Sequence, residues 1–151
     1  MDELLAATDD DFCYLTTRGR VSGRPHEIEI WFALDGRTLY LLSGGGDRSD
    51  WVRNLLAEPA VTVRLRDMTS AATARVVEAG DESERGRGLV FEKYQPRYTG
   101  SLERWRRESL LVAIDVRGTD GRRDDLARPL VHRHAHAGGP ARSPQRAEWD
   151  A

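Results

Sequence analysis

A run of alternating residues ending in Asp35-Gly36 restricts the fold of this chain more than any other feature. One face of residues 26–34 holds Ile28, Ile30, Phe32 and Leu34, and the other holds Glu27, Glu29, Trp31 and Ala33. A period of two is typical of a half-buried strand. Asp-Gly is a strong signal for a tight hairpin turn, and residues 38–43 form a natural returning strand. The sequence therefore predicts an antiparallel hairpin here.

The rest of the chain predicts further short strands and two main helices. The other expected strands are 12–17, 60–66, 71–79 and 109–117, and the expected helices are 50–58 and 81–94, with an additional turn at 101–107. Ser49 or Asp50 could cap the first helix, and Asp81-Glu82-Ser83-Glu84 resembles a capping box for the second. Short turns between about six strands favour a mainly β (α+β) antiparallel barrel with two or three flanking helices.

Composition excludes several classes of protein. The 23 basic and 25 acidic residues nearly cancel, which disfavours nucleic acid as a partner. The chain lacks an apolar run long enough for a membrane span, and its acidic start is unlike a secretory signal, so we expect a cytoplasmic protein. After Gly118 large apolar residues become rare. We therefore expect a folded domain over 1–117 and a disordered tail over 118–151.

No metal centre or hydrolytic site is predicted. Cys13 is a single cysteine and cannot form an internal disulfide. His132, His134 and His136 alternate in the tail without a cysteine, which makes a poor metal site, so we assign no metal. The residue order suggests neither a Ser-His-Asp nor a Cys-His pairing.

The glycine-rich loop before the first main helix is the strongest functional signal. Ser43, Gly44, Gly45 and Gly46 lead through Arg48 into this helix. Glycines let a ligand approach the backbone, and a helix start offers N–H donors and a positive dipole end, so this segment suits an anion. A flexible loop with a capped helix is the competing interpretation. The spacing fits neither a Walker A loop nor a dinucleotide-binding fingerprint.

Three further groups of residues could line a ligand. Trp51 and Asn54 are three residues apart and share a helix face, where they offer a ring and an amide. The basic turn holds Arg18, Arg20 and Arg24 and could contact an anion. Tyr94 and Tyr98 could line a pocket with rings and hydroxyls. Packing or solvent exposure is the alternative interpretation for each group.

The order of these pieces resembles a known family. The carrying segments are Leu15-Thr16-Thr17-Arg18-Gly19-Arg20-Val21-Ser22-Gly23-Arg24-Pro25, then Ser43-Gly44-Gly45-Gly46, then Trp51-Val52-Arg53-Asn54-Leu55 and Pro59-Ala60-Val61-Thr62-Val63. Over residues 12–117 the chain is similar to the deazaflavin-dependent nitroreductases. These belong to the split β-barrel flavin and deazaflavin oxidoreductases, which are related to pyridoxamine 5'-phosphate oxidases.

The resemblance implies a six-stranded antiparallel split β-barrel that binds coenzyme F420 and reduces a small-molecule substrate. The acceptor would be an activated alkene, a quinone or a nitro compound. The cofactor-binding residues that the resemblance implies are Ser43, Gly44, Gly45, Gly46, Trp51 and Asn54. We add Arg48, Arg20, Arg24 and His26 to the predicted cofactor-binding set. The resemblance implies that Tyr94 and Tyr98 bind the substrate. We add Trp31 to this set and predict Tyr98 as the proton donor.

Two other functions stay open at this stage. One is an FMN-dependent oxidoreductase of the same barrel class, and the other is a carrier that binds a ligand without turning it over. Split barrels of this class often form a homodimer, and no feature of the sequence decides whether this chain does.

Overall fold

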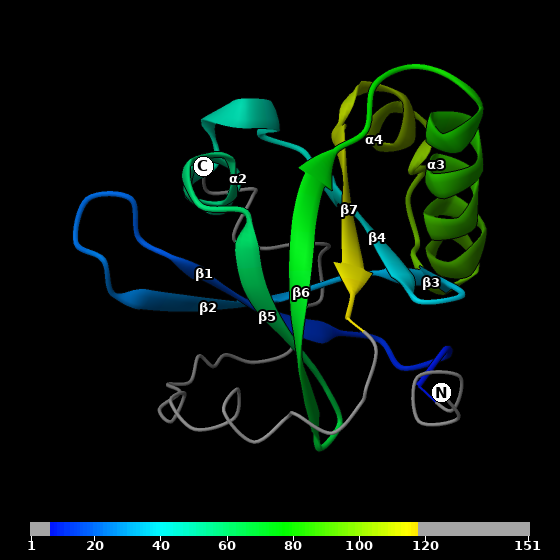
Figure 1. Ribbon diagram of the computed structural model, residues 1–151. Coiled ribbons are helices and arrows are strands. Elements are labelled where there is room, and N and C mark those ends of the chain that lie inside the picture. The colour runs from blue at the N-terminus through cyan, green and yellow to red at the C-terminus, as the bar shows by residue number, and fades with distance from the viewer. Residues whose placement is uncertain (1–6, 118–151) are drawn as a thin grey trace.

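The chain forms one curled antiparallel sheet with helices packed against it (Figure 1). The computed structural model describes residues 7–117. The strands are β1 (Cys13–Arg18), β2 (Pro25–Ile30), β3 (Ala33–Asp35), β4 (Thr38–Ser43), β5 (Ala60–Leu65), β6 (Met68–Val76) and β7 (Leu110–Val116). The helical segments are η1 (Gly46–Arg48), α2 (Asp50–Ala57), α3 (Asp81–Tyr94), η2 (Gln95–Arg97) and α4 (Glu103–Glu108). The predicted class, a mainly β α+β split barrel, is confirmed.

The described residues contain seven strands where the sequence predicted six. The order is β2-β1-β5-β6-β7-β4-β3, so β2 and β3 lie at opposite edges of the sheet. Only Trp31 and Phe32 separate these two strands, and both side chains are buried. The expected single strand over 26–34 is therefore wrong. We call Trp31 and Phe32 the seam, because they carry the chain from one sheet edge to the other.

The two tight hairpins differ in how visible they are in the sequence. Between β3 and β4, Asp35 pairs with Thr38 and Gly36 adopts φ 65°, as the Asp-Gly signal predicted. Between β5 and β6, Leu65 pairs with Met68, and Arg66 adopts φ 57°. The expected start of β6 at Ala71 is thus three residues late, because this turn carries no glycine or asparagine to mark it.

Alternation along the central strands supplies two cores. Inside the barrel, Leu39 and Leu41 of β4 and Val112 and Ile114 of β7 pack with the apolar face of α2. On the other face of the same strands a second core packs against α3 and the α4 region. It includes Tyr40, Leu42, Leu111, Ala113, Val90, Tyr94 and Leu102. Strands buried on both faces account for the continuously apolar sequence of β4 and β7.

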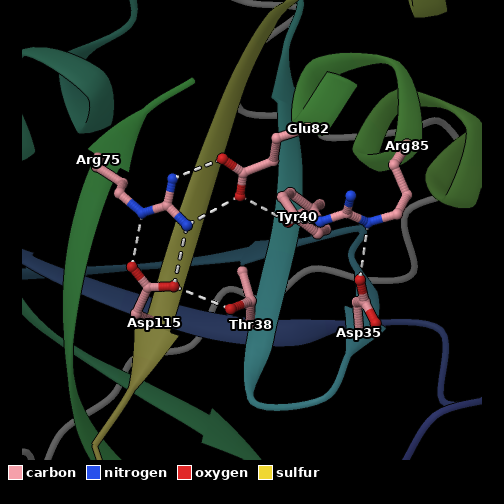
Figure 2. A network of polar contacts seen from close by, with 7 residues as sticks. All are labelled: Asp35, Thr38, Tyr40, Arg75, Glu82, Arg85 and Asp115. Atoms are coloured by element: carbon pink, nitrogen blue, oxygen red, sulfur yellow. Dashed lines mark hydrogen bonds and ion pairs between the residues drawn. The ribbon is translucent and has the colours of Figure 1, made fainter. Parts of the chain in front are cut away.

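A polar network fastens the start of α3 to the sheet (Figure 2). Arg75 of β6 donates to both carboxylate oxygens of Glu82 at 2.9 Å and to Asp115 of β7 at 2.7 and 3.2 Å. The Tyr40 hydroxyl donates to Glu82 at 2.7 Å. Arg85 extends the network to Asp35 at 3.1 Å. Glu82 therefore joins α3 to β4 through Tyr40 and to β6 through Arg75. Arg75 in turn joins both to β7 through Asp115.

Neither expected helix cap forms. Ser49 occupies the cap position of α2 without a side-chain hydrogen bond to the helix. Gly80 precedes α3 with φ 147°, and Asp81 is already helical, so the predicted capping box is absent. Glu82 is diverted to Arg75 and Tyr40. At α3, the network takes the place of the predicted capping box.

Candidate functional site

The glycine-rich loop connects the end of β4 to α2 at one end of the sheet (Figure 1). The buried Ser43 hydroxyl donates to the Gly46 carbonyl oxygen at 2.9 Å and lies 3.0 Å from the Ser49 hydroxyl. Gly46 adopts φ 65°, a conformation that favours glycine. Gly44 is exposed, and Gly45 and Gly46 are half-buried. Ser43 thus shapes the loop, while the glycines leave its backbone approachable.

The start of α2 keeps its capacity for an anion. No side chain of the described residues caps η1 or α2. In the first turn of α2, the N–H groups of Val52 and Arg53 both donate to the Ser49 carbonyl oxygen. The exposed Arg48 side chain has no ion-pair partner within residues 7–117. Uncapped amides beside an unpaired guanidinium are a suitable environment for a phosphate or carboxylate.

Asn54 joins the basic turn to α2. Its buried Oδ1 accepts from the Arg20 backbone N–H at 3.1 Å and from the Arg20 guanidinium at 2.7 Å. Its Nδ2 donates to the Thr17 hydroxyl at 3.1 Å. Arg20 also pairs with Asp50 at 3.3 Å. The structure therefore brings Arg20 beside α2, and it uses the Asn54 amide as a fastening between α2 and β1.

Arg24 and His26, the other two predicted cofactor-binding residues near the basic turn, are not bonded to α2 within residues 7–117. Within the part of the chain that the structure describes, the side chains of Arg24 and His26 make no hydrogen bond to α2 or to the glycine-rich loop. His26 instead packs against Gly19, where an added Cβ would lie 2.7 Å from the His26 Nε2. Trp51, in the first turn of α2, is buried in the barrel core. Its ring is thus a core contact.

The three predicted substrate-binding residues do come together, on the α3 side of the sheet. The Trp31 ring stacks on Tyr94 with centroids 4.1 Å apart and an interplanar angle of 6°. Tyr98 meets Trp31 edge-on at 6.0 Å. Trp105 of α4 meets it at 5.7 Å and 90°. We call Trp31, Tyr94, Tyr98 and Trp105 the aromatic cluster.

The two tyrosines of this cluster have different hydroxyl environments. The Tyr94 hydroxyl is buried, accepts from the Phe32 N–H at 3.1 Å, and lies 3.0 and 2.7 Å from the Phe32 and Asp11 carbonyl oxygens. Burial raises the Tyr94 pKa far above its usual range. Tyr98 is half-buried, and its hydroxyl has no hydrogen-bond partner among residues 7–117. Of the two, only the Tyr98 hydroxyl is available to a ligand.

Trp105 links the aromatic cluster to the glycine-rich loop and was missed in the sequence. A Cβ added to Gly44 would lie 3.6 Å from Trp105 Cδ1 and 3.7 Å from its Nε1. That Nε1 is buried and has no hydrogen-bond partner in the described part of the chain. An unpaired buried N–H is uncommon and calls for an explanation. The only signal in the sequence was a tryptophan within the expected turn at 101–107.

The comparisons with known proteins decide the family. The family model described as F420H(2)-dependent quinone reductase matches residues 5–116. The chain belongs to this F420H(2)-dependent quinone reductase family. It is therefore an F420-dependent oxidoreductase, which confirms the predicted enzyme class and the relationship to deazaflavin-dependent enzymes. A search of curated proteins gives no significant match.

Solved structures of other proteins show the same fold. A conserved hypothetical protein of Mycobacterium tuberculosis is 22% identical, with a TM-score of 0.62 and 91% of both chains covered. An F420-H2 dependent reductase, FDR-A, is 23% identical with a TM-score of 0.58, covering 70% of this chain and 95% of that one. A putative pyridoxamine 5'-phosphate oxidase of Listeria innocua is 19% identical with a TM-score of 0.57, covering 78% and 93%.

Some sequence predictions fall outside what the structure describes. The tail over 118–151, the boundary of the domain and the three tail histidines lie beyond or at the limit of residues 7–117. Among the described residues no helix is long and apolar enough to cross a membrane. Homodimer formation stays a prediction.

Proposed function

We propose that this chain transfers a hydride from reduced coenzyme F420 to an electron-poor acceptor such as a quinone, an activated alkene or a nitro compound. Trp105 carries the proposal, because its indole lies beside Gly44 of the glycine-rich loop and meets the Trp31 ring of the aromatic cluster edge-on. Two groups of residues far apart in the sequence, predicted to hold cofactor and acceptor, thus share a neighbour. Hydride transfer requires that proximity.

The residues at the loop fit the chemistry of F420. Its phosphate and oligoglutamate tail are anionic, and the uncapped start of α2 and Arg48 supply donors and positive charge. Arg20, held beside α2 by Asn54, adds a second guanidinium. We assign cofactor binding to Gly44, Gly45, Gly46, Arg48 and Arg20, and we assign Ser43 and Asn54 to holding the loop and Arg20 in place. Trp51 supports them from the core, and Arg24 and His26 would meet only an outlying part of the ligand.

The protein positions the reactants and supplies one proton. When bound, reduced F420 provides the hydride from its C5 atom. Trp31, Tyr94 and Trp105 would orient a planar acceptor by ring contact. The Tyr98 hydroxyl would donate the proton that completes the two-electron reduction, because its O–H is uncommitted whereas that of Tyr94 is held by the seam. No other acid or base is required.

A parallel titration with F420 and FMN tests the cofactor. We expect F420 fluorescence to change at micromolar protein and the reduced coenzyme to be oxidised by a naphthoquinone. The Arg48→Gln variant should weaken F420 binding about tenfold, since it removes a charge-assisted contact. Arg66→Gln is the matched control, because it removes a guanidinium from the β5–β6 turn, at the opposite end of these strands from α2 (Figure 1).

Other outcomes of that titration would redirect the assignment. Tight binding of FMN without F420 would favour a flavin enzyme of the same barrel class. Binding of F420 without oxidation by any of the three acceptor classes would favour a carrier. Equal losses in R48Q and R66Q would show that overall charge, rather than the loop, governs binding.

A further inference from the structure

Lys93 contacts the seam at Phe32. It is the single lysine among the 23 lysine and arginine residues of the chain. It belongs to the last turn of α3. Its Nζ donates to the Phe32 carbonyl oxygen at 2.9 Å and lies 3.7 Å from the centroid of the Phe32 ring and 5.0 Å from that of Tyr94. The ammonium therefore binds Phe32 by both its backbone and its ring.

Two consecutive residues of α3 bind the polar groups of Phe32. The Tyr94 hydroxyl accepts from the Phe32 N–H and also lies 3.0 Å from the Phe32 carbonyl oxygen, to which Lys93 donates at 2.9 Å. Trp31 comes directly before Phe32 in the chain, and its ring stacks on Tyr94. The seam has only two residues between the edge strands. Fixing the N–H and the carbonyl group of Phe32 therefore also fixes the direction of the Trp31 side chain.

Stability alone does not account for an ammonium at this position. Burial lowers the pKa of Lys93 to about 8, and nearby Arg97 acts in the same direction. The groups around it are Asp9, Asp10 and Asp11 before β1, Cys13 in β1, Tyr94 in α3 and Arg97 in η2. A lysine whose pKa falls on folding is penalised while charged, and the penalty lessens only as pH rises above about 8. The charged form thus costs the fold free energy.

We propose that Lys93 is a positioning residue for the acceptor: its ammonium holds the Phe32 peptide, and thereby keeps the Trp31 ring stacked within the aromatic cluster. This inference rests on the proposed function in one respect, that the aromatic cluster receives the acceptor. The hold on the seam itself is independent of any activity.

The test compares Lys93→Met and Lys93→Arg in the full chain. Methionine keeps much of the stem and removes the charge and the donor, whereas arginine retains both. In K93M we expect amide exchange at Phe32 to rise about tenfold and the KM for a naphthoquinone to rise about fivefold, with kcat changed less than twofold. K93R should stay close to the wild type. Arg64→Met is the control, since it removes a cation 4.2 Å from the Tyr14 ring, away from the seam.

The pH profile adds a readout that a purely structural lysine would not move. As pH rises through about 8, Lys93 loses its charge and its hold weakens, so the wild-type KM should increase. Cys13 and Tyr94 do not titrate there, because burial raises the Cys13 pKa to about 12 and that of Tyr94 still further. K93R should abolish the inflection, because arginine stays protonated.

Unchanged Phe32 exchange in K93M would overturn the proposal, as would faster exchange with an unchanged KM. A large fall in the melting temperature of K93M, without a rise in KM, would assign Lys93 to packing and also overturn it. If the wild-type protein reduced no acceptor, the proposed function would fail. The exchange comparison would then still support or overturn the hold of Lys93 on the seam.

Discussion

At the scale of single residues, the two glycines of α3 have opposite consequences for stability. A Cβ at Gly86 would lie 2.8 Å from the Tyr40 ring and 3.0 Å from Leu111, both fully buried. At Gly88 the nearest atom would be 4.0 Å away, at the flexible end of Arg106. The sequence shows both as weak points in a helix. Only the packing shows that Gly86 allows α3 to approach the sheet.

Alanine at these two positions should therefore change stability in opposite directions. We expect Gly86→Ala to lower the free energy of unfolding by about 1–2 kcal/mol through overpacking. Gly88→Ala should raise it by up to about 1 kcal/mol, because alanine favours the helix over glycine. Urea unfolding of both variants measures the pair. A stabilised G86A would show that the contact between α3 and β4 has room for a methyl group.

Asn54 provides a second test at this scale. Alanine would leave the buried Thr17 hydroxyl and the Arg20 N–H without their partner, at a cost of about 1–3 kcal/mol. Detachment of Arg20 should also weaken F420 binding. Arg53→Ala, an exposed position on the same helix, should leave stability almost unchanged. Thermal melting with and without F420 separates the two effects, and equal melting temperatures for N54A and R53A would refute the fastening role.

At the scale of elements, the Glu82 network predicts how the attachment of α3 responds to acid. Hydrogen bonds from Arg75, and then from Tyr40, lower the pKa of Glu82 to about 2 from its ordinary 4.5. A depressed carboxyl pKa stabilises the fold above the unfolded-state value, and this stabilisation is lost as pH falls from about 4.5 towards 2. Solvent screens the partly exposed pair, so its contribution is about 0.5–1 kcal/mol.

Glu82→Gln should remove this part of the pH dependence. The variant is expected to melt below the wild type at pH 7 and to differ from it less at pH 3. At pH 3 the Glu82 carboxyl of the unfolded wild-type chain is already protonated, which removes part of the stabilisation that its folded-state charge gives at pH 7. Glu84→Gln, on the same turn but outside the network, is the control. Melting curves across this range suffice, and a constant gap between E82Q and wild type would contradict the assignment.

Local patterns predicted the elements well where a period or a turn residue was present. The Asp35-Gly36 hairpin, α2, α3 and the final strand lie within a few residues of their expected positions. The split at Trp31 and Phe32 was not predictable, because alternation continues through both residues and only the closing of the sheet forces the break. The Arg66 turn and the missing caps likewise depend on tertiary partners rather than on local preference.

The candidate site shows the same division. Trp31, Tyr94 and Tyr98 were named together, and the structure places them together. Tyr98 was also named as the proton donor. The burial of the Tyr94 hydroxyl against Phe32 could not be foreseen, because it depends on which backbone segment crosses that hydroxyl. Trp105 lacked a motif, and its place beside Gly44 follows from α4 leading directly into β7, which pairs with β4 up to Ser43.

At the scale of the whole molecule, the seam connects barrel closure to the aromatic cluster. The chain passes between the outermost strands through two residues, so the sheet has no long linker that could absorb a shift. Tyr94 and Lys93 hold that passage from α3, and Asp11 ties the segment before β1 to the same place through Tyr94 and Arg97. A change at the seam should therefore reach both stability and the acceptor side.

Removing each tyrosine hydroxyl separates these two consequences. Tyr94→Phe keeps the stack on Trp31 but leaves the buried Phe32 N–H unpaired, so we expect a loss of about 1–3 kcal/mol of stability with a kcat near that of the wild type. Tyr98→Phe should melt almost like the wild type, because its hydroxyl has no partner to lose among residues 7–117. If Tyr98 gives the proton, kcat should fall at least tenfold in Y98F. Denaturation and steady-state reduction of a naphthoquinone measure both variants, and a Y98F enzyme with full kcat would leave solvent as the proton source.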